Sequence, residues 1–284
     1  QKMRYVVMIH IDADKCIACG QCVADCIANN IEIKDKKATV KGECLQCGHC
    51  VAICRSDAVS IPGYDMDDVE KLDPDNKIDP EVLLSCIKAR RSIRDYTEKK
   101  ISEENLRLLA EAGRYTATAK NGQFHRYVFV QNELDTLKDN VWNYIDNIDN
   151  DIAEYGVYKT FLSRKKADAA DDYLFRNAPA VLFITSPRHL DAGLAAQNME
   201  MMACSLGMGV LYNGFLARTA DENRELKTWL GIENETICAC MLLGYPKKNY
   251  YKTAPRKKSL TKKPKKKEIK CKKSTSENGN TKST

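Results

Sequence analysis

The apolar positions in the second half of the chain predict a sheet covered by helices. Residues 180–185 read AVLFIT, a short continuous apolar run typical of a buried strand, and strands are also predicted at 126–131 and 235–243. Residues 189–207 are apolar or small on nearly every side. Such a helix has too few polar positions for a surface helix, so we expect it at an interface.

Two more helices in this half are indicated by the residues at their ends. One is predicted at 103–114, where Ser102 can act as the N-cap. The other is predicted at 222–230, between Asp221 and Gly231, because acidic residues favour a helix start and glycine favours its end.

The first part of the chain has short apolar stretches between cysteines, and an acidic polar stretch follows it. Asp79 and Pro80 then form a good helix start, since Asp caps and Pro is tolerated in the first turn. Three short strands are predicted in the first part, at 9–12 (IHID), 31–33 (IEI) and 59–61 (VSI). The pattern divides the chain into a domain at 1–64, a linker at 65–78, a larger domain at 79–257 and a tail at 258–284.

Composition fits a globular protein. The chain has 284 residues, of which 43% are hydrophobic, enough for a sizeable core. No apolar run approaches the roughly 18 residues of a membrane span. The first ten residues, QKMRYVVMIH, lack the apolar region and cleavage site of a signal peptide.

Charge is unevenly distributed. Residues 256–284 contain 12 Lys and Arg and 2 Asp and Glu, a net charge of +10, so the rest of the chain carries −4 of the overall +6. The basic tail could be a nuclear signal, a nucleic-acid arm or a lipid-binding patch, but an unstructured, solvated extension is favoured. Whole-chain charge therefore does not predict binding to nucleic acid or to a membrane.

Eight of the 13 cysteines lie in two related motifs, CIACGQCVADC at 16–26 and CLQCGHCVAIC at 44–54. Seven of the eleven aligned positions are identical, so the segment is an internal repeat. Thiolates are the ligands that iron–sulfur clusters prefer, and cysteines of this kind indicate a reducing compartment, here the cytoplasm. A zinc ribbon is the alternative, but zinc ligands usually come in pairs separated by a long gap.

The repeat resembles bacterial two-cluster ferredoxins, in which three close cysteines bind one cluster and the fourth binds the other. The resemblance implies two [4Fe–4S] clusters. Their ligands would be Cys16, Cys19, Cys22 and Cys54 for one cluster, and Cys44, Cys47, Cys50 and Cys26 for the other.

The larger domain contains a cluster of arginines, RRSIR, at 90–94. Taken alone it is a weak signal, because a solvated helix end has the same composition. It could also bind a phosphate, since the guanidinium forks of arginine pair with phosphate oxygens. Two further segments support the second interpretation: TAKNGQ at 118–123 and the region that ends at Arg256.

In this order, the segments between about 86 and 257 resemble the FMN-dependent nitroreductase family. The resemblance implies an α+β fold with a mixed sheet wrapped by helices, an obligate homodimer, and FMN between the two chains, covered by the loop at 118–123 of the partner. The FMN contacts implied by the family motifs are Arg90, Arg91, Ser92, Arg94, Thr118, Asn121, Gln123, Asn213, Gly214 and Arg256.

The whole chain thus resembles the ferredoxin–nitroreductase fusions of anaerobes. The expected function is an FMN-dependent oxidoreductase that receives electrons through two [4Fe–4S] clusters. It would reduce small acceptors such as nitroaromatics, quinones or activated alkenes, with reduced ferredoxin or NAD(P)H as the donor. No side chain is obliged to act as an acid or base, because the chemistry belongs to the cofactor. The alternative is an electron carrier or flavin-binding protein without turnover.

Overall fold

The computed structural model describes residues 9–148 and 156–259. The described residues divide into two units, one that ends at Thr253 and one that begins at Ala254. The predicted unstructured tail falls mostly at 260–284, outside the described residues. None of the helices in the described ranges combines the length and apolar character that crossing a bilayer requires.

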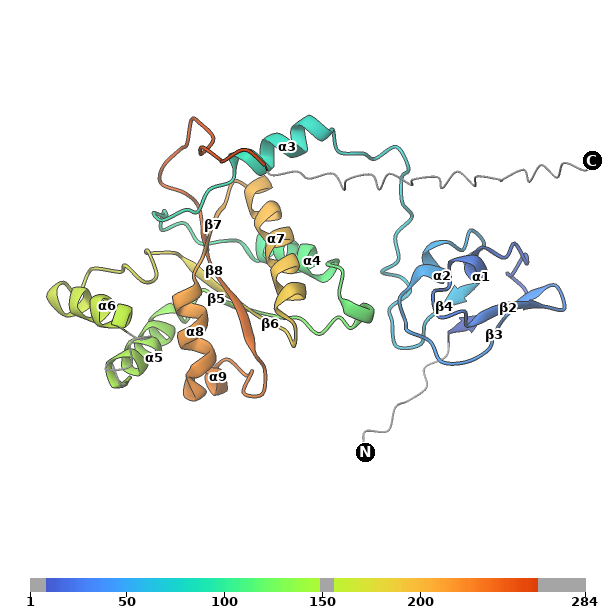
Figure 1. The fold of residues 1–284 in the computed structure, drawn as a ribbon, viewed down its shortest axis with the longest axis horizontal. Helices are drawn as coiled ribbons and strands as arrows, with labels where there is room; N and C mark the ends of the chain where they lie inside the picture. Colours follow the sequence, from blue (N-terminus) through green and yellow to red (C-terminus); the bar gives the residue numbers. More distant parts are fainter. Residues whose placement is uncertain (1–8, 149–155, 260–284) are drawn as a thin grey trace, which may run out of the picture. The chain divides into compact units, whose positions relative to one another are not determined.

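The N-terminal domain is built from two antiparallel strand pairs and two short helices (Figure 1). Three of its four strands lie where the sequence predicts them, and β3 was not predicted. The strands are β1 (His10–Ile11), which pairs with β4 (Val59–Ser60), and β2 (Ile31–Lys34), which pairs with β3 (Lys37–Val40). The helices are α1 (Gln21–Asp25) and α2 (His49–Ala52).

The two cysteine motifs have the same backbone conformation. Gly20 and Gly48 precede α1 and α2 with φ of 73° and 79°, in the left-handed region that glycine adopts at little cost. Two positions earlier, Ala18 and Gln46 also have positive φ, of 55° and 53°. The repeat in the sequence is therefore also a repeat in the structure.

The larger domain has a four-stranded sheet in the order β5-β6-β8-β7, and every neighbouring pair is antiparallel. A parallel pairing is added at its β7 side by an isolated bridge between Ser92 and Val210. The strands are β5 (Arg126–Val130), β6 (Ala180–Thr185), β7 (Gly209–Tyr212) and β8 (Ile237–Gly244).

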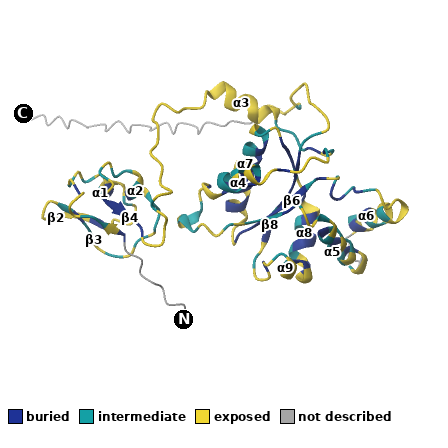
Figure 2. Ribbon diagram, turned by 180° about the vertical axis from the view of Figure 1, so that it is seen from behind, coloured by how far each residue is buried: buried dark blue, intermediate teal, exposed yellow. Residues whose placement is uncertain are grey.

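Helices cover both faces of this sheet, which explains why all six residues of β6 are buried (Figure 2). On one face, Leu182 packs with α4 (Glu103–Arg114) and α7 (His189–Ser205). On the other face of the sheet, Phe183 packs with four helices. These are α5 (Leu134–Asn147), α6 (Gly156–Ala167), α8 (Gly214–Glu222) and α9 (Arg224–Trp229).

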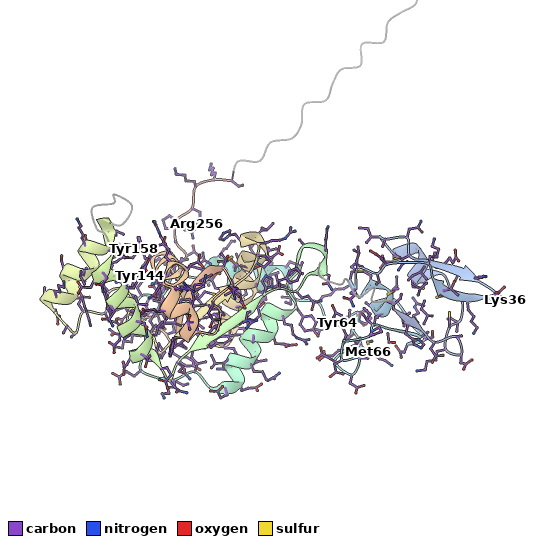
Figure 3. The ribbon with its side chains drawn as sticks, turned by 90° about the horizontal axis from the view of Figure 1, so that it is seen from below. Lys36, Tyr64, Met66, Tyr144, Tyr158 and Arg256 are labelled. Carbon is purple, nitrogen blue, oxygen red and sulfur yellow. The ribbon has the colours of Figure 1, made fainter. Side chains whose placement is uncertain are left out.

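Tyr158 shows how the second layer is fixed. This α6 residue is 1% exposed, and its hydroxyl donates to the Phe215 carbonyl oxygen at 3.0 Å (Figure 3). A buried phenol needs such a partner, because an unpaired hydroxyl in an apolar layer is costly. The bond ties α6 to α8.

Two helix starts that the capping residues predict are confirmed. α3 (Pro80–Ala89) begins after Asp79, whose carboxylate accepts from the backbone N–H groups of Glu81 and Val82 at 2.8 and 2.9 Å. α4 begins after Ser102, whose hydroxyl accepts from the N–H of Asn105 at 3.3 Å. Both caps satisfy donors that the first turn leaves unpaired.

The helix predicted at 222–230 is wrong at its start. Asp221 lies inside α8, and its carboxylate accepts from the N–H of Ile237 at 2.9 Å and pairs with Lys227 at 3.1 Å. The cap of α9 is instead Asn223, whose side chain accepts from the N–H of Leu226 at 3.0 Å. The acidic residue that suggests a cap is used for contacts with a distant strand.

Candidate functional site

The first group of cysteines combines three residues of motif 16–26 with the last cysteine of motif 44–54. Cys22 is buried, and burial raises the pKa of its thiol, with further contributions from Cys16, Cys19 and Cys54. These side chains thus lie close enough to influence one another. They are the four residues that the ferredoxin resemblance assigns to one cluster.

The second group contains Cys44, Cys47, Cys50 and Cys26. Burial, together with the neighbouring Cys44 and Cys47, raises the pKa of the Cys50 thiol to about 11. All four cysteines line one cavity, whose other walls are mainly apolar. The structure therefore brings Cys26 of the first motif to the three cysteines of the second.

Backbone N–H groups point at several of these sulfurs. Hydrogen bonds of 3.2–3.4 Å run from Asn30 to Cys26, Ala38 to Cys16, Gln46 to Cys44 and Ala58 to Cys54. For Cys54, burial raises the pKa, but hydrogen bonds from the Ser56 hydroxyl and from the N–H groups of Ala58, Ser56 and Val59 together lower it more. Donors of this kind stabilise thiolate charge and tune the potential of a cluster that the sulfurs hold.

The cysteines of the described residues are all free thiols. Within residues 9–148 and 156–259, no group of three or more His, Cys, Asp or Glu side chains is arranged to hold a single metal ion.

The RRSIR segment lies against the start of β7. The N–H of Ile93 donates to the carbonyl oxygen of Val210 at 2.9 Å, and a Cβ at Gly209 would overlap the Ile93 side chain. Glycine at 209 therefore allows the close approach of the two segments. The approach fixes the backbone from which Ser92 and Arg94 project.

The three arginines of this segment differ in what they contact. Arg90 Nη1 donates to Glu200 Oε1 at 3.1 Å. The Arg91 guanidinium donates to three backbone carbonyls, of Lys88, Arg90 and Lys252. Arg94 is exposed, so its guanidinium is accessible to a ligand.

The loop at 118–123 is held in an unusual backbone conformation. Lys120, Asn121 and Gln123 all have positive φ, between 48° and 57°, which costs energy for residues with a Cβ. The Thr118 hydroxyl accepts from the N–H of Gln123 at 3.1 Å, and Asp191 at the start of α7 accepts from the N–H of Ala119 at 3.2 Å. These two hydrogen bonds hold the loop against the start of α7.

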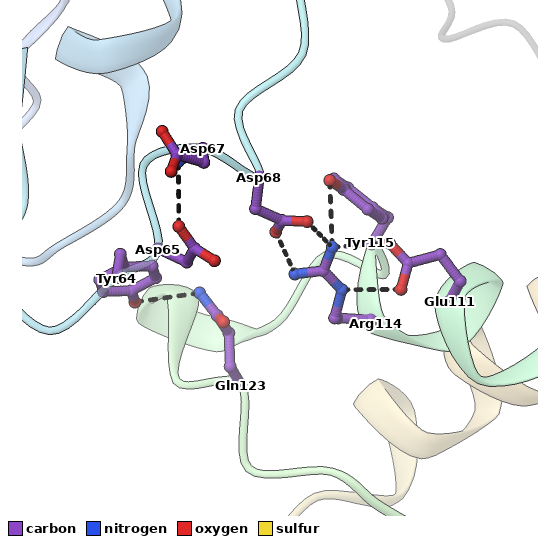
Figure 4. A network of polar contacts seen from close by, with 8 residues as sticks. All are labelled: Tyr64, Asp65, Asp67, Asp68, Glu111, Arg114, Tyr115 and Gln123. Atoms are coloured by element: carbon purple, nitrogen blue, oxygen red, sulfur yellow. Dashed lines mark hydrogen bonds and ion pairs between the residues drawn. The ribbon is translucent and has the colours of Figure 1, made fainter. Parts of the chain in front are cut away.

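Two side chains of this loop contact the N-terminal part of the chain. Asn121 Nδ2 donates to the carbonyl oxygen of Gln46, between Cys44 and Cys47, at 2.8 Å. Gln123 Nε2 donates to the Tyr64 hydroxyl at 3.2 Å (Figure 4).

An ion-pair network lies near the second of these contacts. Arg114, at the end of α4, pairs with Asp68 of the linker and with Glu111, both at 2.6 Å (Figure 4). Hydrogen bonding to Arg114 lowers the pKa of Asp68. The three side chains are solvent-accessible, so we assign the network to positioning of the linker rather than to stability.

Two further predicted FMN contacts, Asn213 and Gly214, lie where α8 begins. The Asn213 side chain is buried and hydrogen-bonded at both ends, because Nδ2 donates to Leu174 O at 2.7 Å and Oδ1 accepts from the N–H of Leu216 at 3.0 Å. Gly214 is exposed, and no atom lies within 4 Å of where its Cβ would be. Arg256 belongs to the separate unit that begins at Ala254, and its role stays a prediction.

Sequence reasoning missed two acidic residues of α7 that contact the predicted site residues. Asp191 holds the loop through Ala119, and Glu200 holds Arg90. Both are buried, at 8% and 1% exposed. The available signal was the presence of carboxylates in a helix made mostly of apolar and small residues, since such groups are rarely buried without a partner.

Comparison with known proteins identifies both parts of the chain. A model of the nitroreductase family matches residues 87–245, and a 4Fe–4S dicluster domain matches residues 15–59. A protein of Archaeoglobus fulgidus with the provisional name NADH dehydrogenase/NAD(P)H nitroreductase is 27% identical over 179 residues, covering 62% of this chain and 93% of its own.

The larger domain is similar to solved structures, and the first of the two described here shows the same fold. A nitroreductase with bound FMN from Desulfitobacterium hafniense aligns with a TM-score of 0.52 and 22% identity, covering 64% of this chain and 97% of that one. An FMN-bound nitroreductase from Bacteroides fragilis aligns with a TM-score of 0.49 and 25% identity, covering 63% and 94%.

The chain is thus an oxidoreductase with an N-terminal ferredoxin-type iron–sulfur domain. Because the family model matches more than half of its residues, it belongs to the nitroreductase family. The expected fold class, α+β with a small ferredoxin-like domain before a nitroreductase-type domain, is confirmed.

Proposed function

We propose that the chain is an FMN-dependent reductase that receives electrons through two [4Fe–4S] clusters. The observation that carries the proposal is the combination, in one chain, of two fourfold cysteine groups with a nitroreductase domain. Small oxidised molecules such as nitroaromatics and quinones are the proposed acceptors, and the cytoplasm is the proposed compartment. Reduced ferredoxin or NAD(P)H would be the donor.

The residues of the larger domain fit FMN. Arg90, Ser92 and Arg94 offer a phosphate the donors it needs, and the arginines add positive charge. The open space beside Gly214 leaves room for a flat ring to approach the backbone, which supports contacts from Asn213 and Gly214 through their main chain. FMN, when bound, supplies the electron and hydride chemistry. The related D. hafniense nitroreductase contains FMN.

The two cysteine groups fit iron–sulfur clusters. Each offers four sulfurs, one of them from the other motif, and backbone N–H donors support several of the sulfurs. We assign Cys16, Cys19, Cys22 and Cys54 to one cluster and Cys44, Cys47, Cys50 and Cys26 to the other.

Purified anaerobically, the protein should contain about eight irons per chain, because each [4Fe–4S] cluster holds four. Iron and acid-labile sulfide are measured on the same sample as zinc. Two zincs per chain without labile sulfide would contradict the assignment of iron–sulfur clusters.

A homodimer is proposed because large apolar side chains are exposed on two helices. Leu190 and Leu194 on α7 are 74% and 44% exposed, and Val82 and Ile87 on α3 are 57% and 50% exposed. A second copy of the chain would bury these positions. Sedimentation equilibrium should give twice the mass of one chain, and a monomer that retains flavin would contradict this proposal.

The direct test of the function is turnover without oxygen. With reduced ferredoxin as donor, a nitroaromatic or quinone should oxidise the reduced flavin repeatedly, and the visible flavin absorbance should return as it does. A protein that carries flavin and clusters but leaves every acceptor unchanged would favour the alternative, a carrier without turnover.

A further inference from the structure

Glu200 is a buried carboxylate in the apolar helix α7. It is 1% exposed, and its neighbours in the helix are methionines. Oε1 accepts from Arg90 Nη1 at 3.1 Å, while Oε2 is buried without a hydrogen-bond partner among the described residues. A buried carboxylate that is only partly satisfied is costly, so it calls for a functional explanation.

Arg90 is held from two directions but leaves most of its donors available. Its backbone N–H caps α3 by donating to the Cys86 carbonyl oxygen at 3.2 Å. A guanidinium has five N–H donors, and in the described part of the chain only the contact with Glu200 uses one of them. The Arg90 side chain is 27% exposed, so its guanidinium lies between the buried carboxylate and solvent.

A second group near the carboxylate stays neutral. Burial raises the pKa of the Tyr212 phenol, and the negative charge of Glu200 and a hydrogen bond with its carboxylate raise it further. The phenol therefore remains protonated near neutral pH and adds no second negative charge beside Glu200. The anionic partner of Arg90 is the Glu200 carboxylate.

We propose that Glu200 is a positioning residue, which holds the Arg90 guanidinium so that its free donors meet the phosphate of FMN. The inference rests on the proposed flavin site. A long arginine side chain loses many rotamers when it binds an anion, and an ion pair formed beforehand removes that cost from binding. The single contact of Glu200 orients the guanidinium without occupying the whole of it.

The test compares FMN with riboflavin, which lacks the phosphate. After removal of bound flavin, each ligand is titrated against the wild-type protein, Glu200→Leu and Glu200→Gln. Glu200→Leu should weaken FMN binding about tenfold, the effect of one charge-assisted hydrogen bond, and leave riboflavin binding unchanged. Glu200→Gln keeps an acceptor for Arg90 and should restore most of the FMN affinity.

Coupling is measured in an Arg90→Gln background. There, Glu200→Leu should not weaken FMN binding further, because the residue through which Glu200 acts is gone. An equal loss of FMN and riboflavin affinity would indicate a merely structural role and overturn the inference. Tighter FMN binding by Glu200→Leu would also overturn it, since Glu200 would then compete with the phosphate.

The two proposals fail in different ways. If the wild-type protein binds neither flavin, the proposed flavin site fails and the inference fails with it. If the wild-type protein binds FMN and Glu200→Leu binds each flavin as tightly as the wild-type protein does, the flavin site stands and the role of Glu200 is refuted.

Discussion

Replacing Cys50 with serine is expected to separate two activities of the protein. Cys50 is buried among Cys44, Cys47 and Cys26, so its loss should remove one cluster. Turnover driven by reduced ferredoxin should fall more than about 100-fold, because even changes next to a metal ligand cost about 10–100-fold. FMN should remain bound, since its proposed contacts begin at Arg90, and chemically reduced enzyme should still reduce a nitroaromatic.

Cys86→Ser is the matched control. Cys86 is exposed on α3 and lies outside both motifs, so its replacement should leave iron content and turnover unchanged. Full ferredoxin-driven turnover by Cys50→Ser, with loss of iron confirmed, would refute the electron route through the clusters. The N-terminal domain would then be a structural or sensing module.

Replacing Arg90 with alanine should lower the stability of the protein and also its affinity for FMN. The change leaves the Glu200 carboxylate buried without its counter-charge, and breaking a buried pair costs about 3–5 kcal/mol. Because Arg90 is partly exposed, we expect the lower end, about 3 kcal/mol, from urea unfolding. FMN affinity should fall roughly 10- to 100-fold through loss of a charge-assisted bond to phosphate.

Two further variants separate these effects. Lys138 is matched to Arg90, since it is 26% exposed and pairs with the buried Asp172 at 2.9 Å. Lys138→Ala should lower stability without changing the ratio of FMN to riboflavin affinity. Arg90→Ala/Glu200→Leu should recover much of the stability but not the FMN affinity. Full FMN affinity in Arg90→Ala would show that Arg90 does not contact the phosphate.

Local patterns in the sequence were sufficient for features that depend on near neighbours. Ser102 and Asp79 cap the helices that follow them, and residues 180–185 form the buried strand β6. The spacing of the cysteines suggested the two groups because the motif itself fixes the turn and short helix around each cluster. The family was recognisable because separate motifs occur in the expected order.

Features that depend on distant partners were not predictable in this way. Asp221 looked like a helix cap, but the tertiary fold brings it to Ile237 and Lys227. Arg91 looked equivalent to Arg90, yet its donors go to backbone carbonyls. The Asn213 side chain is likewise used by Leu174 and Leu216. A sequence does not show which donors are already satisfied.

The sequence by itself determined the cysteine repeat, the order of the domains and the family, because these are encoded in residue types at fixed spacing. Only the tertiary structure decided how the arginines of RRSIR divide their roles and that Glu200 lies beside one of them. Glu200 and Arg90 are 110 residues apart, and they meet because α7 and the end of α3 pack together. The segment after α3 is anchored by Ile93, which is buried in the core and bonds to Val210 of β7, and no local pattern records a contact over that separation.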